Sequence, residues 1–562
     1  MIFFDFEVFV VDWLVVLADA STRTFHTIIN DPDKLRRFYE KNKNEIWIGY
    51  NSRSYDQYIL KGILLDFDPY DISKFIIAEG RKGWEYSSAF KELELYVFDT
   101  MTSHHGLKQL EGFMGNDIRE TDVSFKTARK LTTSELLQVE KYCRHDVEQT
   151  MEVFMNRIDE FETQLALLNA FKLPLSQISK TKAQLAAIIL DSRRQNYSDE
   201  FDITLPDTLR LSKYRQIIDW YSNPMNRDYN KSLKTTVADV PHIFAWGGLH
   251  GAIDNYRGEG LYLNIDVASY YPALMIEYNF LSRSVADPDR YRQIRDERIR
   301  LKKDKSPMQQ PYKIVLNSTY GAMKDKYNAL YDPRQANNVC VCGQLLLLDL
   351  IEKLEPHTQL IQSNTDGVII KLHKYNVDFI KSICAEWEER TRMVLEFETF
   401  ERIYQKDVNN YCIIHADKTY KSKGAYVKKP EALDNDLPIV NKALVNYFVQ
   451  GTPLVETIRS CTNLMEFQKI VKVSSKYLHA MHGDKILSER VLRVFASRSK
   501  RDAGVFKQKT LERIEKIANT PERCFIENGN VNNLPLPAKL DISWYIDVAR
   551  KRLNDFLAGG AI

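Results

Sequence analysis

The sequence predicts a multidomain protein of the α+β class. Its 562 residues correspond to three or four domains at roughly 150 residues each. Apolar residues alternate with polar ones at the start of the chain, as in a strand, and later segments carry apolar residues at helical spacing. Hydrophobic residues make up 44% and charged residues 27% of the chain, which excludes a disordered or collagen-like protein.

The charge balance limits how the protein can attract a polyanion. It has 78 basic and 76 acidic residues, a formal net charge of +2, so a nucleic acid would have to bind local basic stretches. Each such stretch alone is typical of a solvated surface, but three of them with interleaved aromatic residues favour a nucleic-acid partner: residues 292–305, 418–429 and 490–509.

The cellular location follows from the N-terminus and the cysteines. The apolar first 18 residues include three acidic side chains and no basic segment, unlike a signal peptide or a membrane span. The seven cysteines are scattered and form no zinc-binding pattern, as expected of free thiols in a reducing compartment. We therefore expect a monomeric cytoplasmic protein with no membrane partner.

The first expected elements are a strand pair and a long helix. Residues 2–10 alternate between apolar and polar, and a second apolar run follows at 13–18. Thr132 and Glu135 form a capping-box pattern, and the apolar stripe that follows predicts a helix through residue 154. Residues from there to about 200 are expected to be mostly helical.

Later elements follow the same rules. Residues 262–267 are strand-like, and 292–305 have the pattern of a charged helix. Residues 361–372 predict two short strands around a turn at 364–367. We find no repeats, no low-complexity tract and no long flexible linker.

The acidic residues near the N-terminus form the first candidate site. Asp5 and Glu7, two apart on a strand, point to one face, and paired carboxylates suit magnesium or manganese. Alone the pair is more typical of a solvated strand face. Residues 51–56, which follow an apolar run and end in Asp56, and Tyr142 with Asp146, four apart on the predicted helix, favour a site instead.

The second candidate site combines a strand end with a helix. Asp266 begins the segment Asp-Val-Ala-Ser-Tyr-Tyr-Pro at the end of a predicted strand. In residues 313–321, Lys313, Asn317 and Tyr320 share one helix face. A plain amphipathic core helix would account for the apolar residues between them but not for Asn-Ser at the centre.

Together these segments resemble family-B DNA polymerases. Residues 5–7, 51–56 and 142–146 resemble the three exonuclease motifs, and residues 266–272 and 313–321 resemble polymerase motifs A and B, all in the family's order. The resemblance implies an N-terminal RNase H-like 3′-to-5′ exonuclease domain followed by a right-hand polymerase with palm, fingers and thumb.

The chain departs from the family pattern at several places. In motif C, Asn364 replaces the first aspartate and Gly367 the serine, while Asp366 is retained. The stretch 106–110 has glycine where the family often has a hydroxyl, so weaker single-strand binding is expected. Residues 418–420 match the family's Lys-x-Tyr motif.

The resemblance implies a role for each matched residue. The metal ligands and catalytic carboxylates would be Asp5, Glu7, Asp56 and Asp146 in the exonuclease, where Tyr142 orients the water, and Asp266 and Asp366 in the polymerase. Each site would hold two Mg²⁺ or Mn²⁺ ions. Nucleotide would be bound by Ser269, Tyr271, Lys313, Asn317 and Tyr320, with Tyr271 excluding a ribose 2′-OH, and DNA by Asn51, Lys418 and Tyr420.

The motif positions also set domain limits. We expect an exonuclease domain over 1–160, a helical connector over 161–245, palm with motif A over 246–290, fingers over 291–335, palm over 336–430, and thumb and C-terminal region over 431–562. The short gap between Pro272 and Lys313 leaves no room for a protein-priming insertion, so an ordinary nucleic-acid primer is expected.

The expected function is template-directed DNA synthesis from dNTPs with proofreading. The compact chain resembles the phage branch, so we expect the replicase of a phage or mobile element, working on primer-template DNA in the host bacterial cytoplasm. Its helpers would be a clamp, a helicase-primase or a single-strand binding protein. Asn364 and Gly367 leave an alternative open, a repair nuclease with a degenerate polymerase module. A non-catalytic DNA-binding replisome subunit is the third hypothesis, but acidic clusters facing phosphate argue against it.

Overall fold

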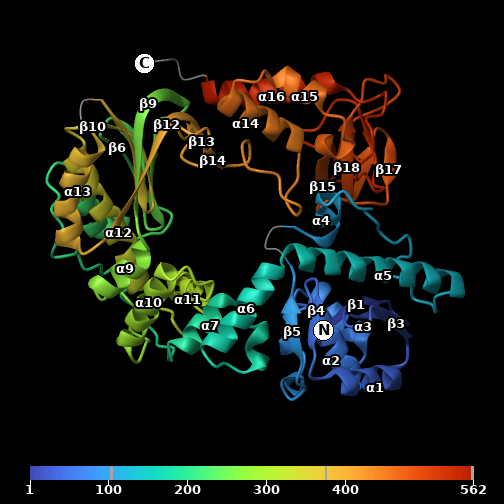
Figure 1. Ribbon diagram of the computed structural model, residues 1–562. Coiled ribbons are helices and arrows are strands. Elements are labelled where there is room, and N and C mark those ends of the chain that lie inside the picture. The colour runs from blue at the N-terminus through green and yellow to red at the C-terminus, as the bar shows by residue number, and fades with distance from the viewer. Residues whose placement is uncertain (102–104, 374–375, 558–562) are drawn as a thin grey trace. The chain divides into compact units, whose positions relative to one another are not determined.

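The structure is a computed structural model that describes residues 1–101, 105–373 and 376–557 (Figure 1). The chain divides into two compact units. The first comprises Met1–Ser179, Pro430–Val440 and Val455–Asp547, and the second comprises Lys180–Lys429, Asn441–Leu454 and the chain from Val548 on. Both units mix helices with β-sheets, so the α+β class holds at this level.

The first unit opens with a five-stranded sheet in the order β3-β2-β1-β4-β5. The first three strands are antiparallel, and β4 and β5 continue the sheet parallel to β1. The expected opening strand pair is confirmed as β1 and β2. The strands are β1 (Ile2–Val8), β2 (Trp13–Asp19), β3 (Thr24–Ile29), β4 (Ile46–Gly49) and β5 (Tyr96–Asp99).

Successive β1 side chains point to opposite sides of the sheet. Apolar side chains on both sides are buried in core clusters, so both faces of the sheet are buried. Phe4 and Phe6 join one core cluster with residues of α1 and α2, whereas Phe3 joins another with the apolar stripe of α5. The predicted capping box at Thr132 is confirmed and starts α5. The helices of this part are α1 (Pro32–Asn42), α2 (Asp56–Leu64), α3 (Pro69–Ile77), α4 (Leu107–Phe113), α5 (Thr133–Asn156), α6 (Ile158–Ala170), and the 3-10 turns η1 (Gly83–Glu85), η2 (Ser88–Lys91) and η3 (Leu175–Ser179).

The C-terminal part of the first unit consists of two small sheets with the orders β15-β18-β21 and β17-β16-β19-β20. Helix α4 packs against β15 and β18. The strands are β15 (Lys469–Lys472), β16 (His479–His482), β17 (Lys485–Leu487), β18 (Val491–Ala496), β19 (Val505–Gln508), β20 (Ile514–Lys516) and β21 (Cys524–Ile526), with α15 (Leu454–Ser460) and η5 (Leu464–Phe467) before them. Helices α14 (Pro438–Gln450) and α16 (Ile542–Leu557) each contribute residues to both units.

The second unit is built on a nine-stranded antiparallel sheet in the order β14-β13-β12-β9-β11-β10-β8-β7-β6. Its strands are β6 (Ser232–Val237), β7 (Val240–Ala245), β8 (Gly248–Ala252), β9 (Tyr256–Val267), β10 (Thr358–Asn364), β11 (Gly367–Leu372), β12 (Leu395–Asp407), β13 (Asn410–Ile414) and β14 (Tyr420–Lys423). The two short strands expected around 364–367 are confirmed as β10 and β11.

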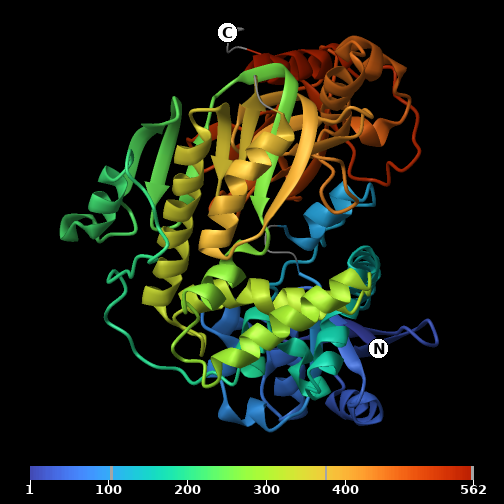
Figure 2. The same ribbon diagram turned by 60° about the vertical axis from the view of Figure 1, so that its left-hand side comes forward.

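Helices cover the sheet and extend beyond it. Figure 2 shows α12 and α13 lying against one face of the nine-stranded sheet. The expected charged helix is confirmed as α10, and the motif B segment lies in α11. The helices are α7 (Lys182–Ile189), α8 (Gln216–Ser222), η4 (Pro224–Asn226), α9 (Tyr270–Glu277), α10 (Pro288–Lys303), α11 (Gln309–Lys324), α12 (Pro333–Leu354) and α13 (Val377–Thr391).

The segment 161–245, expected to be a helical connector, is helical only in part. Residues 232–245 form the hairpin of β6 and β7 at the edge of the large sheet. Its turn residues Ala238 and Asp239 both have positive φ, at 47° and 63°. Asn-Gly is the usual sequence for such a turn. Because this turn lacks Asn-Gly, the hairpin was not predicted from the sequence.

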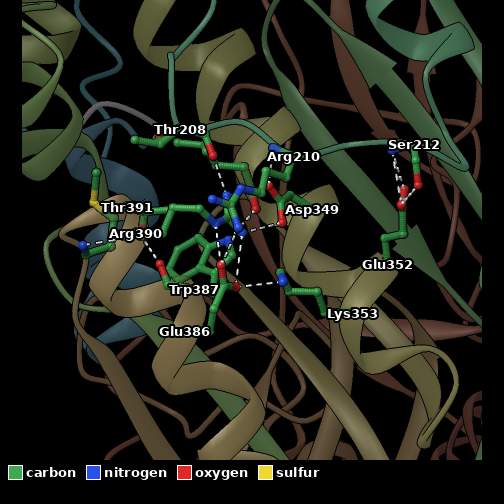
Figure 3. A network of polar contacts seen from close by, with 12 residues as sticks. Thr208, Arg210, Ser212, Asp349, Glu352, Lys353, Glu386, Trp387, Arg390 and Thr391 are labelled. Carbon is green, nitrogen blue, oxygen red and sulfur yellow. Dashed lines mark hydrogen bonds and ion pairs between the residues drawn. The ribbon is translucent and has the colours of Figure 1, made fainter.

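A polar network ties the segment after α7 to α12 and α13 (Figure 3). Arg390 donates two hydrogen bonds of 2.9 Å to the two carboxylate oxygens of Asp349 and another to the Thr208 carbonyl. The backbone N–H of Arg210 donates to Asp349 at 2.7 Å. Because Asp349 is fully buried, these donors are needed to offset its lost hydration.

Two further observations concern membrane-spanning helices and the cysteines. None of the helices in the described ranges has the length and hydropathy needed to cross a membrane. None of the seven cysteines, all of which lie in the described ranges, forms a disulfide, and six of them are buried.

Candidate active sites

The first candidate site lies where β1, α2 and α5 meet. Strand β1 carries Asp5 and Glu7 on its α5-facing side, Asp56 is the first residue of α2, and Asp146 lies on α5. Glu7, Asp56 and Asp146 are each at most 6% exposed, which excludes a solvated strand face. The structure therefore brings the four predicted carboxylates into one buried cluster.

The carboxylates of this cluster repel one another. Burial and then the charges of Asp56 and Asp146 raise the pKa of Asp5 well above its ordinary value. Burial and then Asp5 raise the pKa of Glu7 in the same direction. Burial raises the pKa of Asp56 to about 7 and that of Asp146 to about 6. Such a cluster is stabilised by cations, so the residues present fit divalent metal.

Hydrogen bonds fix two of these carboxylates. Asp56 Oδ1 accepts a 3.2 Å hydrogen bond from the Phe6 backbone N–H. The thiol of Cys143 on α5 contacts Asp5 at 3.3 Å through the backbone oxygen and 3.5 Å through Oδ2. Cys143 lies one residue after Tyr142, so the apolar stripe of α5 also supports the site.

Three charged or titratable residues of this site were missed in the sequence. Lys108 on α4 contacts Asp146 and Glu111, and the Nζ–Glu111 Oε1 distance is 3.0 Å. Its Nζ also lies 4.5 Å from the centre of the Tyr142 ring. His145 Nε2 is 3.7 Å from Glu111 Oε1. The sequence pattern of residues 106–110 drew attention to a missing hydroxyl group. It did not indicate that the lysine in this stretch lies in the site.

Asn51 lies in the loop between β4 and α2 in the left-handed conformation, with φ of 62°. Asparagine tolerates this conformation better than most residues. Its backbone N–H donates to Asp99 Oδ1 at 2.9 Å, and the Arg53 N–H donates to Asp99 Oδ2 at 3.0 Å. Asp99, at the end of β5, thus shapes the loop that leads to Asp56.

The second candidate site lies at the ends of β9 and β11. Asp266 faces Gly367 across the antiparallel pair, and Asp366 occupies the turn between β10 and β11. The Asp366 carbonyl accepts a 2.8 Å hydrogen bond from the Val267 N–H, which joins the two aspartate segments. The two predicted polymerase carboxylates are therefore neighbours.

The Asp266 carboxylate is partly buried and anchored. Asn264 Nδ2 donates to its Oδ2 at 2.6 Å. Burial raises the pKa of Asp266 to about 6, with further upward contributions from Asp366 and Glu398 that outweigh Lys421. An uncompensated pair of this kind fits a divalent ion.

Of the two departures in motif C, the glycine has a local physical reason. A Cβ at Gly367 would lie 2.1 Å from Asp266 Oδ1 and 2.9 Å from the Ile265 carbonyl. The side-chain oxygen of Asn364 accepts a 2.9 Å hydrogen bond from the Thr365 N–H and so stabilises the turn that carries Asp366. An aspartate could make the same bond, so the turn does not require asparagine.

A cavity of about 340 Å³ opens beside Asp366. It is lined by all five residues predicted to bind nucleotide, namely Ser269, Tyr271, Lys313, Asn317 and Tyr320. Ring centres of Tyr271 and Tyr320 are 4.4 Å apart. A cavity of this size suits a small phosphorylated ligand.

Arg298 adds a second cation to this cavity. Its Nη1 donates to Ser269 Oγ at 2.6 Å, and Ser269 has a φ of 50° at the start of α9. In the sequence, Arg298 belongs to the basic stretch 292–305, which alone is typical of a solvated surface. The fold decides for the cavity because α10 lies beside α11, which carries Lys313.

The two Lys-x-Tyr residues lie apart from the cavity. Lys418 is exposed before β14 with φ of 65°, and Tyr420 is half-buried with the Lys429 ammonium 5.1 Å from its ring centre. Neither is among the described residues that line the cavity. Their neighbour Lys421 instead pairs with Glu398 on β12.

Comparisons with known proteins gave similarities to solved structures. Neither the protein-family models nor the curated proteins include a match to this chain. Among solved structures, the family B DNA polymerase from the hyperthermophilic archaeon Pyrobaculum calidifontis is similar with a TM-score of 0.44 and 14% identity, covering 100% of this chain and 78% of that chain.

Proposed function

We propose that this chain is a template-directed DNA polymerase with 3′-to-5′ exonuclease activity. The observation that carries the proposal is the cavity that Arg298 and Lys313 line together with Asp366. Cations that bind a triphosphate next to carboxylates that bind its metal ions are the parts phosphoryl transfer needs.

At the polymerase site, Asp266 and Asp366 would hold two Mg²⁺ or Mn²⁺ ions. Bound there, the ions would supply a lowered pKa for the primer 3′-OH and offset charge on the transferred phosphoryl group. Lys313 and Arg298 bind triphosphate oxygens, and Tyr320 packs under the nascent base pair with Asn317 beside it. The Tyr271 ring excludes a ribose 2′-OH, which makes dNTPs the substrates.

At the exonuclease site, the four carboxylates Asp5, Glu7, Asp56 and Asp146 would hold divalent metal. The metal would supply an activated water for hydrolysis of a phosphodiester. Tyr142 orients that water, and Asn51 helps to place the single-stranded 3′ end. Removal of a mispaired terminal nucleotide and extension of a paired one together give proofreading synthesis.

The remaining assignments complete the proposal. Residues 1–160 form the exonuclease domain, the nine-stranded sheet is the palm, α10 and α11 belong to the fingers, and residues from 431 on form the thumb. Lys418 and Tyr420 contact the primer strand. The enzyme works as a monomer on a nucleic-acid primer, in the cytoplasm, as a phage-type replicase assisted by replisome helpers.

Incorporation of labelled dNTPs into a primed template tests the polymerase activity. The wild type is expected to incorporate all four in the presence of Mg²⁺, and Asp366→Ala is expected to incorporate none. If Asp366→Ala leaves every measurable activity intact, the result would favour the alternative hypothesis of a nuclease with a degenerate polymerase module. Absence of metal-dependent turnover at either site would favour the non-catalytic subunit.

A further inference from the structure

Lys108 places an ammonium group inside the exonuclease carboxylate cluster. Its side chain is 15% exposed and donates to Asp146 Oδ1 and, at 3.0 Å, to Glu111 Oε1. Two of its three N–H donors are used in this way, and the Tyr142 ring lies against the group at 4.5 Å. The cluster therefore already contains a cation of its own.

The position of this ammonium is one that could otherwise hold a metal ion. Glu111, His145 and Asp146 are all buried, and their ligand atoms lie within 4.8 Å of one another. Asp5, Glu7 and Cys143 form a second group of the same kind. Lys108 contacts two of the three potential ligands of the first group, Glu111 and Asp146.

Two features hold the ammonium in place. Ion pairs with the buried carboxylates of Glu111 and Asp146 hold its Nζ between two elements, α4 and α5. Helix α4, which carries it, is tightly packed. A Cβ at Gly112 would lie 2.8 Å from the Ile470 side chain, and the buried Arg493 donates to the Gly112 and Asn116 carbonyls at 3.2 and 2.7 Å.

We propose that the Lys108 ammonium replaces one of the two divalent ions that the family resemblance implies at the exonuclease site. A single divalent ion then binds at Asp5 and Glu7, the carboxylates of the second group. The inference rests on the proposed exonuclease function and refines its metal requirement. Lys108 keeps one N–H donor for an oxygen of the scissile phosphate, where a second metal ion would otherwise supply positive charge.

The test is the number of Mn²⁺ ions that the full-length chain binds, measured by the loss of the free-ion signal in electron paramagnetic resonance. Asp266→Asn with Asp366→Asn forms the parent, which removes the polymerase ligands. The parent is expected to bind one ion that is lost on Asp5→Asn. Lys108→Met is expected to bind two, close enough to show magnetic coupling. Lys126→Met, at an exposed lysine, is the matched control and keeps one.

Each outcome decides the matter. Two Asp5-dependent ions in the parent would overturn the replacement while leaving the exonuclease proposal intact. A single uncoupled ion in Lys108→Met would also overturn it. No Asp5-dependent ion in the parent would overturn the replacement and the exonuclease metal site together. If Lys108→Met does not fold, Lys108→Gln removes the positive charge but keeps an N–H donor and all the potential ligands, and the same two coupled ions are expected.

Discussion

Gly367 lies so close to Asp266 across β11 and β9 that a Cβ at position 367 would stand 2.1 Å from Asp266 Oδ1. The Ile265 carbonyl, 2.9 Å from the same point, leaves little room on the backbone side. The glycine in motif C is therefore part of how Asp266 is positioned, and its replacement of serine does not indicate a lost active site.

Gly367→Ala is expected to displace the Asp266 carboxylate and to lower the rate of dNTP incorporation by about 100-fold, since a misplacement near 1 Å costs about that much. Exonuclease activity should be unchanged. Single-nucleotide incorporation under saturating dNTP measures the effect. Gly247→Ala is the control, because a Cβ there meets no atom within 4 Å. An unchanged rate in Gly367→Ala would contradict the role given to the glycine.

The pH dependence of synthesis should report Asp266. Burial raises its pKa to about 6, Asp366 and Glu398 add to the rise, and Asn264 and Lys421 oppose it. Metal binds the deprotonated carboxylate, so dNTP incorporation at low Mg²⁺ should fall as the pH drops below about 6. Raising the Mg²⁺ concentration should move the midpoint to lower pH. A midpoint independent of Mg²⁺ would argue against Asp266 as a ligand.

The exonuclease cluster should cost stability when metal is absent. A carboxyl group with a raised folded-state pKa binds protons more tightly in the folded state, so the free energy of unfolding falls as pH rises. For Asp56 the window runs from its ordinary value of 3.8 to about 7. Asp56→Asn in EDTA at pH 8 should therefore raise the free energy of unfolding by about 2–4 kcal/mol.

The gain in Asp56→Asn should shrink as the pH is lowered from about 7 toward 3.8, and below that value the wild-type carboxyl becomes protonated in both states. Urea unfolding at several pH values measures it. The exposed Asp122→Asn serves as the control. A gain that does not depend on pH would show that removed charge is not the cause.

The buried pair of Arg390 and Asp349 should be needed for the fold of the second unit. Arg390→Met leaves Asp349, which is fully buried, with the Arg210 N–H as its remaining donor in Figure 3. Removing one partner of a buried pair costs about 3–5 kcal/mol. Thermal unfolding should show this loss. Arg300→Met removes only exposed ion pairs, so it should change little. Equal effects of the two variants would contradict the account.

Periodicity and motif spacing predicted much of both sites. The alternating pattern at residues 2–10 and the capping box at Thr132 are local signals, and they correctly gave β1 and α5. Asp5 and Asp146 lie on these elements, but the expectation that they join Asp56 in one site came from the family resemblance. The Asp366 turn was likewise a local signal.

The contributions of distant packing could not be predicted. Lys108 reaches Asp146 because α4 packs against α5, and α4 also packs against β15 and β18, whose residues lie more than 300 positions away in the chain. Arg298 lines the cavity beside Asp366 because α10 packs against α11. The β6–β7 hairpin was not predicted because its turn residues are Ala238 and Asp239. The usual sequence for such a turn is Asn-Gly.

The central claim is that one chain removes a mispaired terminus at one site and extends a paired one at the other. A 5′-labelled primer with a single 3′ mismatch, annealed to a longer template with Mg²⁺, tests this in one reaction. The wild type should shorten the primer without dNTPs and trim and then extend it with them, Asp5→Ala should not trim, and Asp366→Ala should only shorten. Shortening in the wild type with no extension under any condition would contradict the polymerase.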